Sequence, residues 1–318
     1  MEVFRGLPPP ARRQPCAVTI GNFDGVHRGH QALLSLLTGE ARSRGLPACV
    51  LTFEPHPRDY FAQATGRPDG APARVGTLRD TVLELKRCGV QRLVILRFDH
   101  ALASLSAQSF IDEVLVTGLQ AGYVLVGDDF RFGARRTGDY GFLDAQGSRL
   151  GFDVARMMSY EVHGLRVSSS AVREALAAGD MARTAALLGR PFRLSGRTIY
   201  GAQLGRELGF RTLNLRLPWR RSAAMGIFVA RVHGLTPEPL PAVASLGVRP
   251  TVEDAGRLLL ETHCLHWPDA LGLNGGYGRC IQVELTHHLH EERQYGSLQA
   301  LREGIAQDVA DAKRWHGL

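Results

Sequence analysis

Strand patterns and helix patterns alternate through the first half of this chain. The predicted strands are residues 18–20, 48–53, 92–98 and 123–126, and the predicted helices between them are residues 28–44, 77–88 and 107–119. The strand segments are apolar on both faces, as in a parallel sheet that helices cover from both sides. The alternation therefore predicts an α/β domain with a parallel sheet, whose ligands bind at the carboxyl ends of its strands.

The most specific motif, GNFDGVHRGH, follows the first of these strands. Its glycine-containing turn leads into a helix, whose N-terminus attracts anions through unpaired N–H groups and the helix dipole. His27 and His30, with Gly29 between them, could both reach a polyphosphate and stabilise charge in a transition state. The alternative is that the two histidines are structural or solvated. The turn also supplies the candidate ligand-binding residues Gly21, Phe23 and Asp24.

Two other polar segments come directly after predicted strands. In TFEPHP, two prolines restrict the backbone around His56, which is a candidate ligand-binding residue or part of a rigid turn. In GDDFRFG, Gly127 and Asp129 could contact ribose, base or metal. Phe130 and Phe132 of the same segment either pack against a flat ligand ring or fill the core.

A third segment, VSSS, begins the next predicted helix, residues 168–179. The Ser168 hydroxyl could cap that helix or donate to a phosphate. Arg173, one turn later, could clamp a leaving pyrophosphate or could be solvated.

Composition narrows the classes of function. The formal net charge is +7, and only Lys86 and Lys313 among the 38 basic residues are lysines. No GxxxxGK[ST] motif occurs, which excludes a P-loop. We expect no nucleic acid ligand, because no basic block interleaved with aromatics occurs. No apolar run approaches the about 18 residues of a membrane span. The five cysteines lack a CxxC pair and suggest reduced thiols in a cytoplasmic protein.

The second half has a different pattern. After a short predicted helix at 181–188, the segment GRPFRLSG breaks the alternation, and we predict domains at residues 1–188 and 189–318. The short β runs beyond it are residues 197–200, 227–232, 258–266 and 281–285, and glycine and proline turns separate them. These runs predict a small antiparallel barrel. A terminal helix at 297–315 carries one apolar stripe and should pack on the barrel.

Candidate chemistry in the second half is less specific. The glycine-spaced loop that contains Gly205 and Arg206 could turn backbone N–H groups towards phosphates. Thr212 and Asn214, two residues apart on an extended segment, offer oxygens that suit Mg²⁺. Glu261 lies within an apolar predicted strand, on the face opposite Leu260 and Thr262. It is either a general base for a hydroxyl nucleophile or a solvent-facing side chain.

The chain resembles the bacterial bifunctional riboflavin kinase/FAD synthetases (FMN adenylyltransferases) over nearly its whole length. The motifs GNFDGVHRGH, TFEPHP, VGDDFRFGARRTGD and SSSAVREAL occur in this order in that family. The resemblance implies a Rossmann-like HxGH nucleotidyltransferase domain, followed by a six-stranded riboflavin kinase-like barrel with a terminal helix. The implied substrates are ATP, riboflavin and FMN, the final product is FAD, and the implied metal is Mg²⁺. It implies neither a membrane nor an obligate protein partner.

The resemblance also implies roles for single residues. His27 and His30 would bind ATP phosphates during adenylyl transfer, and the ATP and FMN site would be lined by Asp129, Ser168 and Arg173. In the barrel, the residues that match the family's GFPTAN motif are Thr212 and Asn214, which would hold Mg-ATP. Glu261 would activate the riboflavin 5′-hydroxyl.

Three features depart from the family pattern. Arg211 replaces the proline of GFPTAN, His290 stands where the family has arginine, and the segment 268–278 is longer and richer in glycine. One alternative is therefore an adenylyltransferase whose barrel only binds flavin. Another is a non-catalytic flavin carrier or regulator, although such a protein would not need His27, His30 and Arg173.

Overall fold

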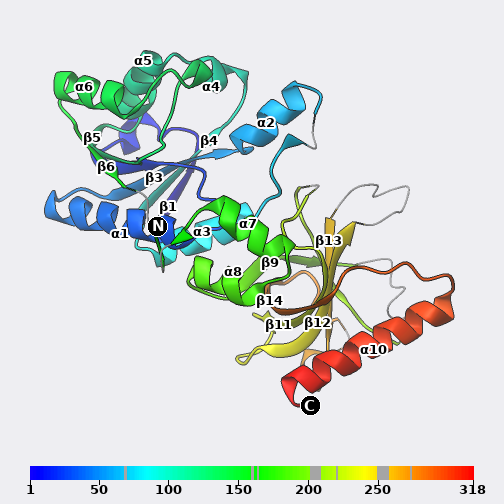
Figure 1. Cartoon of the computed structure of the whole chain (residues 1–318). Coiled ribbons are helices and arrows are strands. Elements are labelled where there is room, and N and C mark those ends of the chain that lie inside the picture. Colours follow the sequence, from blue (N-terminus) through cyan, green and yellow to red (C-terminus); the bar gives the residue numbers. More distant parts are fainter. Residues whose placement is uncertain are drawn as a thin grey trace. The chain divides into compact units, whose positions relative to one another are not determined.

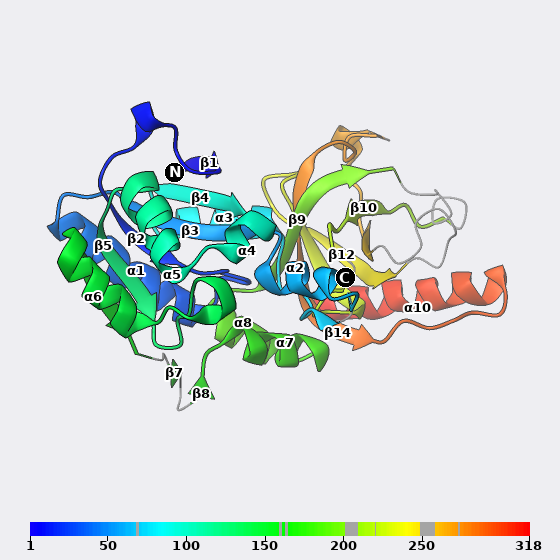
Figure 2. The same cartoon turned by 90° about the horizontal axis from the view of Figure 1, so that it is seen from above.

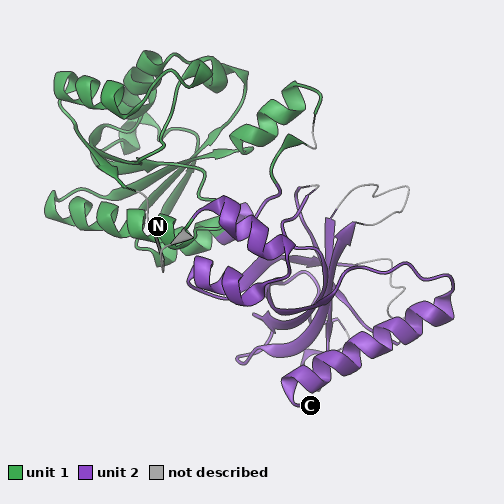
Figure 3. Cartoon of the chain, viewed as in Figure 1, with its two compact units in different colours: residues 1–72, 81–167 green, residues 73–80, 168–318 purple. Residues whose placement is uncertain are grey.

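The computed structural model describes residues 1–67, 70–158, 161–162, 165–200, 209–219, 221–248, 258–272 and 274–318. The chain divides into two compact units (Figure 3). The first comprises residues 1–72 and 81–167, and the second comprises residues 73–80 and 168–318.

The first unit is built on a parallel sheet, as predicted, and this sheet has six strands instead of the four predicted. Its strands, in spatial order, are β1 (Glu2–Arg5), β4 (Arg92–Arg97), β3 (Ala48–Glu54), β2 (Cys16–Ile20), β5 (Ala121–Gly127) and β6 (Asp153–Met157). From β2 the chain builds β3 and β4 on one side, and it later places β5 on the other. The order therefore reverses at β2, and ligands of open α/β sheets bind at such a point.

Helices cover both faces of this sheet (Figure 1). Helix α1 lies on one face, and α5 and α6 lie on the other. The helices that begin in this part of the chain are η1 (Pro10–Arg12), α1 (Arg28–Ser43), α2 (Pro57–Ala64), α3 (Leu78–Arg87), α4 (His100–Ser104), α5 (Ala107–Ser109), η3 (Phe110–Gly118), η4 (Ala134–Arg136) and α6 (Tyr140–Leu150). The short strands β7 (Glu161–Val162) and β8 (Leu165–Arg166) pair with each other.

Two features of the first unit differ from the sequence prediction. Residues 2–5 precede the first predicted strand, yet they form the edge strand β1, because Phe4 is buried against the core. The helix expected at 107–119 is α-helical only over α5 and continues as the π-helix η3. The π-helical turns bury Phe110, Ile111, Val114 and Leu115 together, and the spacing of these apolar residues does not distinguish a π-helix from an α-helix.

The second unit contains a closed barrel of six antiparallel strands, as the resemblance implied (Figure 2). In spatial order they are β10 (Leu213–Arg216), β13 (Leu258–Cys264), β12 (Leu240–Val248), β11 (Gly226–His233), β14 (Cys280–His290) and β9 (Phe192–Ile199). The first barrel strand begins earlier than the predicted residue 197, because residues 192–196 of the segment GRPFRLSG already belong to β9. The burial of Phe192 and Leu194 inside the barrel overrides the local glycine and proline signals.

The terminal helix α10 (Leu298–His316) packs on β11 and β12, as predicted. Ser297 caps its N-terminus by accepting a hydrogen bond from the Ala300 N–H. Val309 and Ala312 contact a small apolar cluster of the barrel. Leu298, at the start of the expected stripe, is 62% exposed and takes no part in that packing.

Two helices connect the sheet and the barrel in sequence, α7 (Ser169–Ala177) and α8 (Met181–Leu188). By their contacts both belong to the second unit, and α8 packs on β9 and β14. The predicted domain division after residue 188 stays a prediction. The second unit also contains η5 (Asp269–Leu271).

Candidate functional site

The HxGH motif lies at the N-terminus of α1, directly after β2. His27 is the N-cap residue, and its Nδ1 accepts a hydrogen bond from the His30 N–H at 3.3 Å. The two imidazole rings stack with centroids 3.7 Å apart and an angle of 16° between them. The motif thus forms a compact pair of rings at the positive end of the helix dipole.

Gly29 is what allows the two rings to stack. A Cβ atom at this position would lie 3.2 Å from His27 Nδ1 and 3.2 Å from the Val167 carbonyl oxygen. The turn before it is also tightly constrained, since Phe23 has a positive φ of 50° and its ring lies 5.0 Å from that of His30. Gly21 leaves room for that Phe23 ring, and Asp24 is buried in the same turn.

Burial controls the charge of His30. Removal from solvent, and secondarily the nearby His27, hold the pKa of His30 well below its usual range. Its Nδ1 is buried and has no hydrogen-bond partner among the described residues. His30 is therefore a neutral imidazole at neutral pH, and such a ring could meet an anion as a hydrogen-bond donor but not as a cation.

Three other predicted residues of the first unit lie at the same edge of the sheet. His56 follows β3 and caps α2, because its Nδ1 accepts a hydrogen bond from the Arg58 N–H at 3.1 Å. Gly127 ends β5, and Asp129 lies two residues further on. Since β3, β2 and β5 are neighbours in a parallel sheet, the segments that follow them meet at one edge.

The two phenylalanines of the GDDFRFG segment belong to the core. Phe132 is buried, and Phe130 stacks on it with centroids 5.3 Å apart. Phe132 also contacts Phe110 and Phe142. Of the two alternatives that the sequence left open, core packing is therefore correct for Phe132.

Ser168 and Arg173 lie on α7, in the second unit. The Ser168 hydroxyl caps α7 by accepting from the Ala171 N–H at 3.2 Å. Arg173 is half-buried, and its Nε donates to the Ala73 carbonyl oxygen at 2.6 Å. Its guanidinium is therefore oriented by the backbone and is not simply solvated.

The predicted residues of the barrel lie in a row across two strands. Asn214 on β10 is directly opposite Glu261 on β13, so the two side chains share a face. Glu261 alternates with the buried Leu260 and Thr262, as expected. Thr212 immediately precedes β10. Gly205 and Arg206 lie outside the described residues.

The oxygens of this row suit a hard cation. Asn214 is 2% exposed, and its Oδ1 is buried without a hydrogen-bond partner among the described residues. A buried amide oxygen without a donor is compatible with a ligand that supplies positive charge. No cluster of three or more His, Cys, Asp or Glu side chains that could hold a metal occurs in the described part of the chain. The donor set therefore fits Mg²⁺ that keeps water and substrate oxygens as further ligands.

Aromatic residues beside Thr212 were not expected from the sequence. The Tyr277 hydroxyl donates to the Thr212 carbonyl oxygen at 3.2 Å, and the Arg211 guanidinium lies 4.2 Å from the centre of the Trp267 ring. Trp267 directly precedes the long glycine-rich segment 268–278 and Tyr277 lies near its end, so the unusual length of this segment was the available signal.

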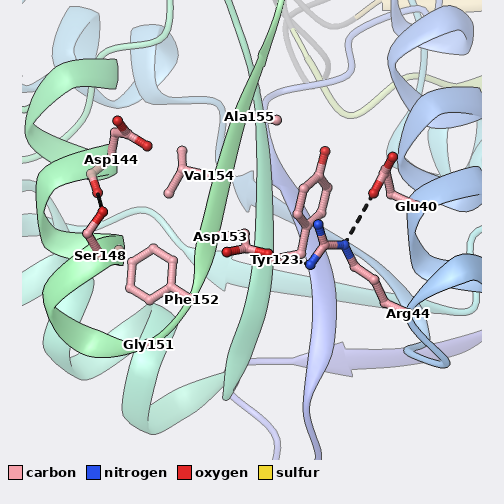
Figure 4. A pocket seen from close by; sticks show the side chains of 11 residues that line it. Glu40, Arg44, Tyr123, Asp144, Ser148, Gly151, Phe152, Asp153, Val154 and Ala155 are labelled. Atoms are coloured by element: carbon pink, nitrogen blue, oxygen red, sulfur yellow. Dashed lines mark hydrogen bonds and ion pairs between the residues drawn. The ribbon is translucent and has the colours of Figure 1, made fainter.

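A polar pocket of about 640 Å³ lies elsewhere in the first unit (Figure 4). Its walls include Glu40 and Arg44 near the end of α1, Tyr123 near the start of β5, and Asp153 at the start of β6. This is the amino-terminal edge of the sheet, opposite the edge that carries His27. It contains none of the predicted site residues.

Comparisons with known proteins cover both halves of the chain. A family model described as FAD synthetase matches residues 10–171, and one described as riboflavin kinase matches residues 188–316. The bifunctional riboflavin kinase/FMN adenylyltransferase of Escherichia coli strain K12 is 44% identical over 320 residues, with coverage of 100% of this chain and 99% of the relative. The protein of the same description from Pseudomonas fluorescens is also 44% identical, with coverage of 98% and 97%.

One solved structure also matches along the whole chain. It is titled as a macrolide-efflux protein from Streptococcus pneumoniae, and it aligns with a TM-score of 0.74 at 25% identity over 98% of both chains. In the described part of the present chain, no helix is both long enough and apolar enough to cross a membrane.

Proposed function

Because this chain belongs to the family of bifunctional riboflavin kinase/FMN adenylyltransferases, we propose that residues 1–188 catalyse adenylyl transfer and residues 189–318 the kinase reaction. The protein phosphorylates riboflavin to FMN and adenylylates FMN to FAD, with ATP as co-substrate in both reactions.

In adenylyl transfer, an FMN phosphate oxygen attacks the α-phosphorus of ATP, and the bond to pyrophosphate breaks with its electron pair. The stacked His27–His30 pair at the N-terminus of α1 is the observation that carries this assignment. Neutral His30 and the helix N-terminus would donate hydrogen bonds to the charge that grows on the phosphates. Arg173, oriented by the Ala73 carbonyl group, would offset the charge of the departing pyrophosphate.

In the kinase reaction, Glu261 would accept the proton of the riboflavin 5′-hydroxyl as that oxygen attacks the γ-phosphorus of ATP. Mg²⁺, when bound, neutralises charge on the ATP phosphates. Thr212 and Asn214 would hold it, and the buried, unpaired Asn214 Oδ1 supports this role. The cross-strand pairing of Asn214 with Glu261 supports a base close to the metal.

The two assignments are separable by experiment. Purified protein is incubated with Mg-ATP and either riboflavin or FMN, and the flavins are separated by chromatography. We expect His30→Ala to lower FAD formation from FMN by about 100-fold or more, while FMN still forms from riboflavin. We expect Glu261→Gln to lower FMN formation by a similar factor and to leave FAD formation from FMN unchanged.

Each variant is the control for the other, because each should slow one reaction and spare the other. FAD from FMN but no FMN from riboflavin in the unmodified protein would mean that the barrel only binds flavin. Bound flavin with no product from either substrate would contradict the enzyme assignment and indicate a carrier.

A further inference from the structure

Two departures from the family pattern contact each other in the barrel. Arg211 stands where the family has proline, and the segment after Trp267 is longer and richer in glycine than usual. The Arg211 Cζ atom lies 4.2 Å from the centre of the Trp267 ring and 5.6 Å from that of Tyr277. The two departures therefore form one structural arrangement beside the strands β10, labelled in Figure 2, and β13, labelled in Figure 1.

The contact of Arg211 is mainly with ring faces. Its Nη2 is buried and has no hydrogen-bond partner within the described residues. A desolvated guanidinium is attracted by the faces of tryptophan and tyrosine rings. Tyr277 in turn stacks on Tyr200, with centroids 4.1 Å apart and an angle of 19° between the rings.

The glycine-rich segment is itself anchored. The Thr198 hydroxyl on β9 donates to the Gly276 carbonyl oxygen at 2.6 Å, and the Gly278 N–H donates to the Thr198 carbonyl oxygen at 3.1 Å. The Trp267 indole N–H donates to the Gly272 carbonyl oxygen at 2.9 Å. The rings that receive Arg211 are thus attached to the barrel wall.

The same arrangement holds the backbone immediately before Asn214. The Tyr277 hydroxyl donates to the Thr212 carbonyl oxygen at 3.2 Å. His263 Nδ1 donates to the Arg211 carbonyl oxygen at 2.8 Å. Two consecutive carbonyl groups are therefore fixed by side chains at the point where the chain enters β10.

A proline at residue 211 would fix φ by its ring, whereas an arginine does not. We propose that Arg211 is a positioning residue for Mg-ATP in the kinase reaction: its contact with Trp267 and Tyr277 holds the Thr212 backbone and thereby orients the Thr212 and Asn214 oxygens. The inference rests on the proposed role of Thr212 and Asn214 in holding Mg-ATP.

Arg211→Met tests the role of the charge, because it keeps an apolar stem and removes the guanidinium. We expect the KM for Mg-ATP in riboflavin phosphorylation to rise about five-fold, with kcat and the KM for riboflavin within about two-fold of the unmodified protein. Arg211→Lys, which keeps a cation, should recover part of the loss. Arg231→Met is the matched control and should leave both KM values unchanged. Arg231 lies on β11, which is not adjacent to β10, and its Cζ atom lies 5.9 Å from the centre of the Trp315 ring.

The link through Tyr277 makes a second test. Tyr277→Phe keeps the ring and removes the donor to Thr212, so it should raise the KM for Mg-ATP alone. Combining it with Arg211→Met should do no more than the larger single effect, because both act through the same carbonyl group. Multiplied effects, an unchanged KM for Mg-ATP in Arg211→Met, or an equal rise in both KM values would overturn the inference.

A direct binding measurement separates this inference from the proposed function. In a Trp219→Phe, Trp315→Phe background, Trp267 is the remaining tryptophan of the three in the chain. Mg-ATP is titrated without flavin, and Trp267 emission is followed with Arg211 present or replaced by methionine. If Arg211→Met weakens the affinity for Mg-ATP about five-fold, the result supports the inference even if no FMN forms. Equal affinities, or no response with Arg211 present, overturn it.

Discussion

The His27–His30 pair depends on a residue that has no side chain. Gly29 lies under the stacked rings, where an added Cβ would press on both His27 Nδ1 and the Val167 carbonyl oxygen. Burial, and secondarily the nearby His27, hold the pKa of His30 well below its usual range, and this keeps its ring neutral. The spacing HxGH is therefore a packing requirement as well as a chemical one.

A pair of substitutions in α1 checks this packing requirement. Gly29→Ala must move the His27 ring or the Val167 backbone, so we expect FAD formation from FMN to fall about ten-fold or more. Gly39→Ala, in the same helix, meets nothing within 4 Å and should stabilise the protein by about 0.5–1 kcal/mol with unchanged activity. The measurements are FAD formation and urea unfolding. Full activity in Gly29→Ala would contradict the packing argument.

Among the elements, helix α3 begins in an unusually closed hydrogen-bond arrangement. Asp80 Oδ2 accepts from the Thr77 N–H and hydroxyl, and the Thr77 hydroxyl accepts from the Asp80 N–H. Asp80 Oδ1 accepts from the Ser195 N–H and hydroxyl on β9. The capping box of Thr77 and Asp80 therefore also attaches the segment 73–80 to the barrel of the second unit.

Replacement of Asp80 by asparagine should be costly, because an amide nitrogen would face one of these donors. We expect a loss of about 1–3 kcal/mol in the free energy of unfolding at pH 7. Asp180→Asn is the control, since Asp180 caps α8 in an exposed position and asparagine caps helices equally well. Equal stability of the two variants in denaturant unfolding would contradict the role of Asp80.

Asp80 also has a pH signature. Burial raises its pKa above the ordinary value, although four hydrogen bonds oppose this. The folded state therefore holds the proton more tightly than the unfolded state, and the contribution of Asp80 to stability grows as pH falls through the raised pKa. Asp80→Asn should remove this gain, as unfolding measurements at pH 4 and pH 7 would detect.

The molecule as a whole should lose stability in mild acid because of its histidines. Burial is the largest cause that lowers the pKa of His30, His233, His263 and His316. The unfolded chain takes up protons at these sites first, so their stabilising effect is present above the ordinary histidine pKa and is lost as pH falls below it.

We therefore expect the free energy of unfolding to be lower at pH 5.5 than at pH 7.5. His30→Asn should reduce the difference between the two pH values, whereas His100→Asn, at an exposed position on α4, should leave it unchanged. A pH difference as large in His30→Asn as in the unmodified protein would contradict the assignment.

Local sequence patterns were sufficient to predict the parallel sheet and the polar residues that follow its strands. The runs that became β2, β3, β4 and β5 are continuously apolar, and in a parallel sheet that alone places their carboxyl ends together. The His27–His30 spacing and the caps at Thr77 and Ser168 are likewise local, since each depends on residues within one helical turn. These features were therefore predictable from the sequence.

Contacts between distant segments were decided only by the tertiary structure. Strands β1, β6 and β12 were not predicted, because short or glycine- and proline-containing strands gain their stability from partners far away in sequence. The register that sets Asn214 opposite Glu261 and the approach of Arg211 to Trp267 follow from closure of the barrel. The sequence by itself determined which side chains are available at each strand end, and barrel closure and burial decided which of them meet and in what charge state.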